Sequence, residues 1–444
     1  MLIKINYDRA SSCQRIRAGG ARKGAEVTEW IGAAEAADRL GIKPASLYAY
    51  VSRGVLSRRR DADGRVSMFD ADEIAELARK GKPRRPAGSS ELIIETAVTE
   101  ITEHSLHYRG LDAIGLARHR SFEDVANLLW AGSLPDDRTP GIPRSHSWWK
   151  ATPAALTAAA AAQAALPAAT LPLERLQVIV PALAATDQFR MHLDQPAVMA
   201  AGKALIAGMA GSLPLAGGRP RPGAGADAAA DGGSIASRLA ARLCTGPVPD
   251  GLTAVLGVAL VLLADHELAA STLAARVAAS MRADPYAVVA TGLGAMGGAV
   301  HAGAALGAEL MLSAAATPAD VPQVVGDVLR RGERLPGFGH FVYKGGDPRA
   351  NLLLQVTTDF AADSPRLPVA AAVIAEVRRR SLPEPNIEFA LAVLADVAGM
   401  TRGSGEAIFA VARTAGWLAH ALEEYERNVP IRPRAVYIGP AASS

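Results

Sequence analysis

The sequence contains only two cysteines in 444 residues, Cys13 and Cys244. One pair cannot form the disulfide framework of a secreted scaffold, so a cytoplasmic location is expected. The longest largely apolar run in the middle of the chain, residues 252–264, ends at Asp265. It is shorter than the roughly 20 residues that a membrane-spanning helix requires. The first residues lack the apolar stretch of a secretory signal, and we expect no membrane contact.

The motifs of several large enzyme classes are also missing. No Gly-x-Ser-x-Gly elbow occurs, which argues against a serine hydrolase of that type. His266 and Glu267 are followed by Ala270 where a zinc helix would have its second histidine. A Gly-x-Gly-x-x-Gly match at Gly292 falls inside or at the end of an expected helix rather than after a strand. We therefore expect no metal and no dinucleotide cofactor.

Composition and charge indicate a folded chain with more than one part. Half of the residues are hydrophobic and 20% are charged, which excludes wholesale disorder. Residues 1–90 hold 18 Lys and Arg against 11 Asp and Glu, a balance of +7, and the remaining 29 against 33 give −4. This charge asymmetry is typical of a nucleic-acid-binding domain attached to a neutral or acidic domain. A basic, solvated N-terminal tail gives the same count.

Residues 28–80 have a compact helical pattern. Ala and Leu recur at helix spacing from Trp30 to Gly41, and Pro44 can open a second short helix. A turn signal at residues 63–64, a strand-like RVSMF and an amphipathic DADEIAELARK follow, which indicates a wing and a packing helix. The stretch resembles the winged helix-turn-helix of excisionase-like DNA-binding modules.

This resemblance implies contacts with nucleic acid. The candidate residues are four near a major groove and three arginines near phosphates: Ser46, Tyr48, Tyr50, Arg53, Arg58, Arg59 and Arg60. A helical oligomerisation or docking module is the alternative. Residues 1–27 form a basic tail, and the Pro-, Gly- and Ser-rich residues 81–90 are expected to be a linker.

The body, residues 91–444, is predicted to be mainly α-helical. SFEDVANLLWAGSLP and STLAARVAASM show helical periodicity, and Asp284 with Pro285 marks a helix start. Four polar islands interrupt the apolar helices of the second half. They are ADHELAAST, GGAVHAGAA, LPGFGHFVYKGGDPRA and ARTAGWLAH. A buried His or Arg in such surroundings needs a partner or a ligand, and arginines bind carboxylates in a bidentate manner.

These islands carry a family resemblance. IETAVTEITEHSLHYRGLDAIGLA, SFEDVANLLWAGSLP, ADHELAAST, GAVHAGAA, GFGHFVYKGGDPRA, PNIEF, ARTAGWLAH and IRPRAVYIG follow one another in the order typical of citrate synthases. The chain from about residue 91 to 438 therefore resembles the citrate synthase family. The resemblance implies a mainly helical homodimer with a small domain, roughly 250–360, and a large domain formed by the rest of the body.

The resemblance also implies a reaction and the residues that perform it. Acetyl-CoA and oxaloacetate would give citrate and CoA, with no cofactor besides the acyl-CoA co-substrate. His301 would hold the thioester oxygen, His340 would donate a proton to the ketone of oxaloacetate, and Glu388 would remove the methyl proton. The substrate carboxylates would be bound by His266, Arg349 and Arg413 and, from the partner subunit, by Arg432.

Four residues depart from the family pattern. Glu388 stands where the family normally has Asp, and one extra methylene moves the carboxylate by about 1 Å, which can reduce the rate about 100-fold. Phe341, Ala302 and Ala269 also differ and lie beside proposed site residues. Two alternatives follow: a 2-methylcitrate synthase that uses propionyl-CoA, or a catalytically weak metabolite sensor coupled to a DNA-binding module.

Overall fold

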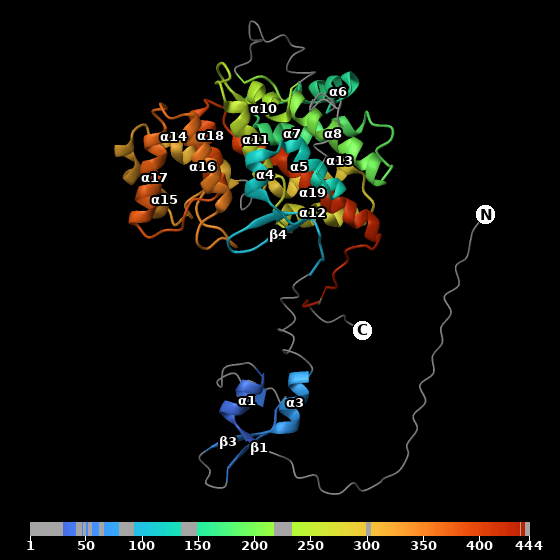
Figure 1. The fold of residues 1–444 in the computed structure, drawn as a ribbon, viewed down its shortest axis with the longest axis vertical. Helices are drawn as coiled ribbons and strands as arrows, with labels where there is room; N and C mark the ends of the chain where they lie inside the picture. Colours follow the sequence, from blue (N-terminus) through green and yellow to red (C-terminus); the bar gives the residue numbers. More distant parts are fainter. Residues whose placement is uncertain are drawn as a thin grey trace, which may run out of the picture. The chain divides into compact units, whose positions relative to one another are not determined.

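The computed structural model describes residues 30–40, 47, 50–51, 56–61, 66–79, 93–134, 149–216, 233–298, 303–435 and 437–439. The chain divides into two compact units (Figure 1). One comprises Met1–Ile93 with Ala435–Ser444, and the other comprises Ile94–Arg434. The expected tail at residues 1–27 and the expected linker at 81–90 lie outside the described residues.

The smaller unit contains a three-stranded antiparallel sheet in the order β1 (Trp30–Gly32), β3 (Ser67–Asp70), β2 (Arg58–Arg60). Two helices, α1 (Ala33–Leu40) and α3 (Ala71–Arg79), accompany it. The buried core residues of this unit are Ile31, Ala36, Ala37, Leu47, Leu56, Phe69, Ala71 and Ile74.

The helix expected from Trp30 begins only at Ala33. Residues 30–32 instead pair with β3, and Ile31 lies opposite Phe69 with both side chains buried. Local helical periodicity is outweighed here because the strand finds an apolar partner that is distant in sequence. Ser46, Tyr48 and Arg53 lie outside the described residues, whereas all three residues of β2 are exposed.

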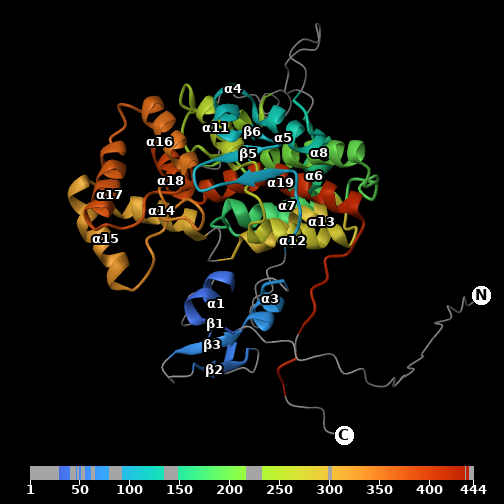
Figure 2. The ribbon, with the colours of Figure 1, turned by 60° about the horizontal axis from the view of Figure 1, so that its bottom comes forward.

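The larger unit is almost entirely helical. Its helices are α4 (Ala113–His119), α5 (Phe122–Ala131), α6 (Pro153–Gln163), α7 (Pro172–Ala184), α8 (Gln195–Ser212), α10 (Ile235–Leu243), α11 (Leu252–Leu263), α12 (Ala270–Ser280), α13 (Pro285–Met296), α14 (Gly303–Ala314), α15 (Val321–Arg330), α16 (Pro348–Phe360), α17 (Leu367–Arg379), α18 (Ile387–Val397) and α19 (Ser404–Arg427), with a 3-10 turn, η2 (Pro318–Asp320). A small antiparallel sheet, β4 (Thr99–Ile101), β5 (Leu106–Tyr108) and β6 (Leu111–Asp112), lies beside α4 (Figure 2). None of the helices in the described ranges combines the length and apolar character needed to span a bilayer.

Local sequence signals explain where several helices begin and end. The side chain of Asp284 accepts hydrogen bonds from the first N–H groups of α13, and Pro285 is its first residue, which confirms the predicted start. Ser121 caps α5 in the same manner, and Gly132 ends that helix in the left-handed conformation.

Two hydrophobic cores hold the larger unit together. The main core draws on helices from α4 to α13, on α19 and on the strands β4 and β5, whereas the second is formed by α14, α15, α17 and α18 (Figure 1). The second core uses residues 308–393, a range that overlaps only part of the expected small domain at roughly 250–360. The side chains of α18 contribute to both cores, so the first turn of α18 lies at their junction.

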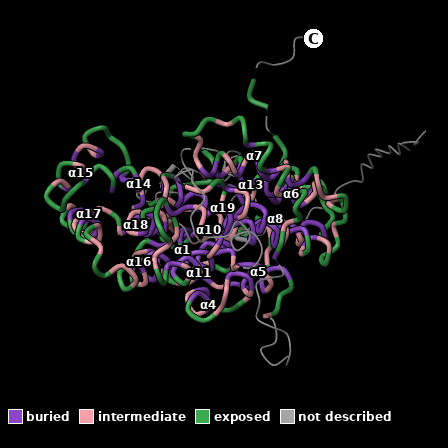
Figure 3. Tube along the Cα trace, turned by 90° about the horizontal axis from the view of Figure 1, so that it is seen from above, coloured by how far each residue is buried: buried purple, intermediate pink, exposed green. Residues whose placement is uncertain are grey.

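Helix α19 is buried along most of its length (Figure 3). Arg413, Gly416 and His420 are spaced by three and four residues, so they share one face of this helix. This face contacts the segment that follows α11, where His266 lies.

Candidate active site

His266 lies in a tight turn directly after α11. The backbone N–H of Glu267 donates to Oδ2 of Asp265 at 3.0 Å, and Glu267 has a φ of 54°. The Nε2 atom of His266 is 3.2 Å from the hydroxyl of Tyr343. Burial, together with Arg349, Arg413 and His340, holds the pKa of His266 well below its usual value. His266 is therefore a neutral imidazole at physiological pH.

The ring of His340 meets that of His266 edge to face, with the ring centres 5.1 Å apart. Its Nδ1 accepts the backbone N–H groups of Val342 at 3.0 Å and Tyr343 at 3.2 Å. An acceptor nitrogen carries no proton, so the proton of the neutral ring is on Nε2. Burial, followed by the nearby Arg349, lowers the pKa of His340 to about 4. The loop therefore presents a neutral N–H donor.

The loop of His340 packs against the start of α18. Gly337 has a φ of 82°, and a Cβ there would lie 2.8 Å from the Cβ of Phe389. The N–H of Asn386 donates to the carbonyl of Gly337 at 3.0 Å, and its side-chain amide donates to the carbonyl of Gly339 at 3.0 Å. Only glycine allows so close an approach at residue 337. This approach joins the loop of His340 to α18, the helix that carries Glu388.

Glu388 is in the first turn of α18 and is half-buried. Its Oε2 is buried and has no hydrogen-bond partner within the described part of the chain. Burial raises the pKa of Glu388, and Arg349 acts in the opposite direction. Glu388 is therefore a stronger base than an exposed glutamate.

Arg349 is buried in the first turn of α16 and bound by Asp347. Its Nε donates to Oδ1 at 3.0 Å and its Nη2 donates to Oδ2 at 2.8 Å. Burial opposes the charge of Arg349, but Asp347 outweighs it and raises the pKa of the guanidinium. The side chain is therefore a fixed cation within the site.

Arg413 brings a second buried guanidinium from α19. Its Nε donates to the carbonyl of Leu263 at 2.9 Å, and its Cζ lies 4.5 Å from the centre of the Phe409 ring. Its Nη2 is buried without a hydrogen-bond partner among the described residues. A buried donor of this kind calls for an acceptor, and the described part of the chain does not supply one.

Five of the residues predicted for the site converge in this region: His266, His340, Arg349, Glu388 and Arg413. Arg349 and Arg413 both act electrostatically on His266 and Glu388. His301 lies outside the described residues. Arg432 is exposed beyond the end of α19, and no contact joins it to these five residues in the described ranges.

Three further residues lie in this region that were not predicted from the sequence: Tyr343, Asp347 and Asn386. Tyr343 contacts His266 and its ring stacks on His340, with the centres 4.6 Å apart. The three residues stand inside the polar stretches GHFVYKGGDPRA and PNIEF. Their proximity to the chosen His, Arg and Glu was the available signal, but their role in orienting neighbours depends on tertiary contacts.

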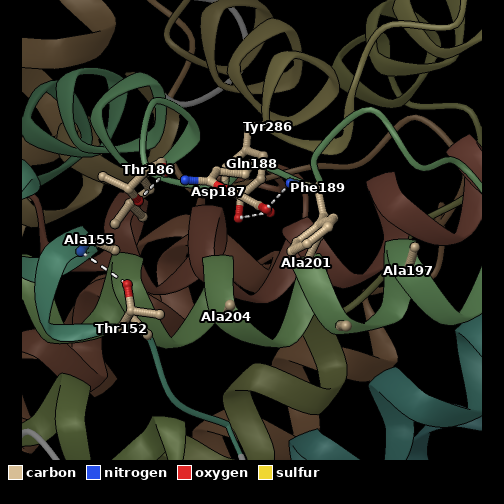
Figure 4. A pocket seen from close by; sticks show the side chains of 13 residues that line it. Thr152, Ala155, Thr186, Asp187, Gln188, Phe189, Ala197, Ala201, Ala204 and Tyr286 are labelled. Atoms are coloured by element: carbon tan, nitrogen blue, oxygen red, sulfur yellow. Dashed lines mark hydrogen bonds between the residues drawn. The ribbon is translucent and has the colours of Figure 1, made fainter.

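A separate cavity of about 410 Å³ lies between α6, α7, α8 and α13 (Figure 4). Alanines from α8 line much of it, including Ala197, Ala201 and Ala204. Its carboxylate, Asp187, already accepts the hydroxyl of Tyr286 at 2.9 Å and the N–H of Phe189 at 2.8 Å. The polar groups that would do chemistry lie instead around His340.

Comparison with known proteins identifies relatives that are similar in sequence. The family described as citrate synthase, C-terminal domain, matches residues 89–434. Citrate synthase of Haloferax volcanii is 32% identical over 345 residues, which cover 75% of this chain and 89% of the relative. 2-Methylcitrate synthase of Mycobacterium tuberculosis is 29% identical over 367 residues, covering 81% and 91%. Citrate synthase 2 of Bacillus subtilis is 38% identical over 185 residues, covering 41% of this chain and 50% of the relative. The chain thus spans about half the length of some relatives that it matches.

Solved structures agree with the sequence comparison. Citrate synthase from Pyrobaculum aerophilum is 27% identical with a TM-score of 0.64, covering 87% of this chain and 96% of the other. Citrate synthase from Thermoplasma acidophilum, solved as a ternary complex with carboxymethyl coenzyme A and oxaloacetate, is 25% identical with a TM-score of 0.65, covering 80% and 96%. The expected mainly helical fold is confirmed, and the chain belongs to the citrate synthase family.

Proposed function

We propose that this protein condenses acetyl-CoA with oxaloacetate to give citrate and CoA. The observation that carries the proposal is the grouping of a neutral His340, a buried carboxylate oxygen of Glu388 and two buried guanidiniums. This set suits a dianionic keto acid and the removal of a proton from carbon.

Oxaloacetate would bind first through its two carboxylates. Asp347 engages Nε and Nη2 of Arg349, so a substrate carboxylate would meet Nη1. The second carboxylate would accept from Nη2 of Arg413, which has no partner in the part of the chain that the structure describes. A neutral His266 adds a hydrogen bond without another charge. The ketone oxygen would then face Nε2 of His340.

Glu388 would next remove a proton from the methyl group of acetyl-CoA. Its raised pKa favours proton transfer from a weak carbon acid, and its Oε2, which has no hydrogen-bond partner among the described residues, would accept the proton. His301 would donate a hydrogen bond to the thioester oxygen as the enol form develops, a role that rests on the family resemblance.

The enol carbon would then attack the ketone carbon of oxaloacetate. As the carbon–carbon bond forms, His340 would transfer its Nε2 proton to the ketone oxygen, which becomes the hydroxyl of citryl-CoA. Water would cleave the thioester to citrate and free CoA. Because His340 starts neutral, it acts as a weak acid that donates only when negative charge develops on the oxygen.

The choice of acyl group is a second proposal. We favour acetyl-CoA, and the similarity to a 2-methylcitrate synthase keeps propionyl-CoA as the alternative. One methylene changes binding by only about 1–3 kcal/mol. Phe341 follows His340 in the chain and is 90% exposed. Among the residues that differ from the family pattern, we propose that Phe341 has the largest effect on acyl-CoA binding.

The deciding experiment is a thiol-release assay with oxaloacetate and either acyl-CoA. We expect turnover with acetyl-CoA that His301→Ala and His340→Ala abolish. His192→Ala, at an exposed histidine between α7 and α8, is the matched control and should retain activity. Retained oxaloacetate binding with no turnover by the natural sequence would instead favour a metabolite sensor.

We further propose that the chain works as a homodimer in the cytoplasm, with Arg432 reaching the partner's site. Sedimentation would test the dimer, and mixing Arg432→Ala with His340→Ala subunits would test the sharing of sites. Restored activity in the mixed dimers is expected, because one of the two sites then has both residues intact.

A winged helix-turn-helix that binds DNA is our proposal for residues 28–80. The support is the exposed edge strand β2, which consists of three arginines, and the Arg59 guanidinium 4.2 Å above the ring of Trp30. DNA binding that weakens with salt and is lost on Arg58→Ala, Arg59→Ala and Arg60→Ala together would support it. Binding that is insensitive to salt, or an altered oligomer without DNA binding, would favour the docking role.

A further inference from the structure

One face of α19 holds three successive residues that precede His266. Arg413 donates from Nε to the carbonyl of Leu263 at 2.9 Å, and the N–H of Gly416 donates to the carbonyl of Ala264 at 2.9 Å. His420 then contacts Asp265, with its Nε2 at 3.2 Å from Oδ2. The helix thus fixes the approach to the turn at residues 265–267 by contacts spaced along a single face.

The carboxylate of Asp265 closes this turn. Its Oδ2 accepts both the backbone N–H of Glu267 at 3.0 Å and the ring of His420. Glu267 has a left-handed φ of 54°, a conformation that a non-glycine residue holds only when its surroundings enforce it. The side chain of Asp265 supplies that constraint. It joins the residue before His266 to the residue after it, through the bond from the N–H of Glu267.

The protonation of His420 follows from its other neighbour. Nη1 of Arg276 lies 2.7 Å from Nδ1 of His420, and a guanidinium can only donate. Nδ1 is therefore the acceptor, and the ring proton is on Nε2, where it donates to Asp265. Arg276 is itself paired with Glu424 and with Glu423. The side chains of His420, Asp265 and Arg276 are fully buried, so no solvent competes for these bonds.

We propose that Asp265 and His420 are positioning residues for His266, acting through the turn rather than by contact with substrate. The proposal rests on the proposed function in one respect, namely that His266 binds oxaloacetate. If His420 no longer donates, Oδ2 of Asp265 keeps a single partner and can rotate away from the N–H of Glu267. The imidazole of His266 then loses its fixed orientation toward Tyr343 and His340.

Two amide substitutions separate the bond of His420 to Asp265 from its bond to Arg276. In His420→Gln, the amide nitrogen stands near the place of Nε2 and can still donate to Asp265, while the contact with Arg276 is lost. In His420→Asn, the amide oxygen stands near the place of Nδ1 and can still accept from Arg276, while the contact with Asp265 is lost. Both variants remove the ring, and asparagine leaves a cavity larger by one methylene than glutamine does, which costs stability in addition to the lost bond.

Steady-state kinetics on the full chain should distinguish the variants. We expect His420→Asn to raise KM for oxaloacetate about tenfold or more, since displacements of about 1 Å reduce rates up to about 100-fold. His420→Gln should stay within about threefold of the natural protein and should lose less thermal stability than His420→Asn. Equal KM values for the two variants, or a larger increase in His420→Gln, would overturn the proposal.

A second readout does not depend on turnover. With ¹³C-labelled histidine, the ring signal of His266, assigned through His266→Gln, should shift or broaden in His420→Asn and remain in place in His420→Gln. A His266 signal that is the same in both variants rejects the positioning role, even if the protein has no synthase activity. If the His266 signal shifts in His420→Asn and not in His420→Gln, but no variant shows turnover, only the proposed function is rejected.

Asp265→Ala covers the case in which the His420 variants do not fold. It removes Oδ2, the acceptor of both the N–H of Glu267 and the ring of His420. The same rise in KM and the same change in the His266 signal are expected. An unchanged KM and signal in this variant would overturn the proposal.

Discussion

The Oδ2 atom of Asp347 accepts the backbone N–H of Ile387 at 3.1 Å, across forty positions of the chain. The same carboxylate binds Nε and Nη2 of Arg349. One buried anion therefore fixes both the guanidinium proposed to grip oxaloacetate and the start of α18, one residue before Glu388. The proposed substrate-binding residue Arg349 and the proposed base Glu388 are therefore linked through the side chain of Asp347.

Replacing Asp347 with Asn should damage stability and activity together. An amide cannot accept from both guanidinium nitrogens and from Ile387, and Arg349 would keep a buried charge without its anion. We expect about 3–5 kcal/mol lower free energy of unfolding in urea and a large loss of thiol release. Asp327→Asn, in an exposed pair with Arg330, is the control and should change stability by less than about 1 kcal/mol. Equal changes in stability and activity for Asp347→Asn and Asp327→Asn would contradict the proposed role of Asp347 in joining Arg349 to α18.

Replacing Glu388 with Gln should separate binding from chemistry. The amide has nearly the same shape but cannot take a proton from carbon, so kcat should fall about 10²- to 10⁴-fold. Oxaloacetate affinity measured by calorimetry should stay the same or increase, because a negative charge near Arg349 and Arg413 is removed. Full turnover by this variant would exclude Glu388 as the base.

The pH profile of kcat should be set on its acid side by Glu388. Burial raises the pKa of Glu388 above 4.5, whereas His340, with a pKa of about 4, stays neutral over the same range. The base loses activity when it is protonated, so kcat should fall as pH falls through the pKa of Glu388. In Glu388→Asp, which keeps a titrating carboxylate, the acid limb should persist at a shifted pH. An acid limb unchanged in position would assign the profile to another group.

Local signals made part of the fold predictable from sequence. Asp284 and Pro285 mark the start of α13 because capping and the fixed φ of proline depend on neighbouring residues alone. Residues 30–32 were wrongly expected to be helical because their partner, β3, lies almost forty residues away. A strand of three residues has too little periodicity to be distinguished without that partner.

The site was predictable to a different extent. The polar islands in apolar helices marked His266, His340 and Arg413, whose roles stay predictions. Asp347 could not be assigned in this way, since its importance lies in joining Arg349 to Ile387. Contacts between segments far apart in the chain are set by packing, and no local pattern encodes them.

Glu406 should make the protein less stable as pH rises toward neutrality. It is buried in the first turn of α19, and burial, followed by Glu309 and Glu174, raises its pKa to about 7. The folded state therefore keeps a proton that the unfolded chain releases near 4.5, and this stabilisation is lost as pH rises from about 4.5 to about 7. Glu406→Gln stays neutral and should be more stable than the natural protein by about 2 kcal/mol at pH 8, with little difference at pH 5. Glu333→Gln, at an exposed position where Arg331 lowers the pKa of the carboxyl, should not change the pH dependence of Tm between pH 5 and pH 8.

Gly416 should not tolerate even the smallest side chain. A Cβ at this position would collide with Oδ1 of Asp265 and lie 2.5 Å from the carbonyl oxygen of Ala264. Both neighbours belong to the segment that α19 holds before His266, and backbone cannot move aside as a flexible side chain can. Gly416→Ala should therefore lower stability by at least about 2 kcal/mol and raise KM for oxaloacetate, although alanine in a helix is otherwise favoured by about 1 kcal/mol.

The matched control is Gly294→Ala in α13, where nothing lies within 4 Å of the added Cβ. This substitution should increase the free energy of unfolding by about 0.5–1 kcal/mol, because it reduces the entropy of the unfolded chain without a clash. Opposite signs for the two glycines, measured by urea denaturation, would show that contact with the Asp265 segment, and not helix propensity, decides the outcome at Gly416. Stabilisation by both substitutions would mean that the segment before His266 moves aside easily. The contacts of α19 with residues 263–265 would then be too weak to orient the imidazole of His266.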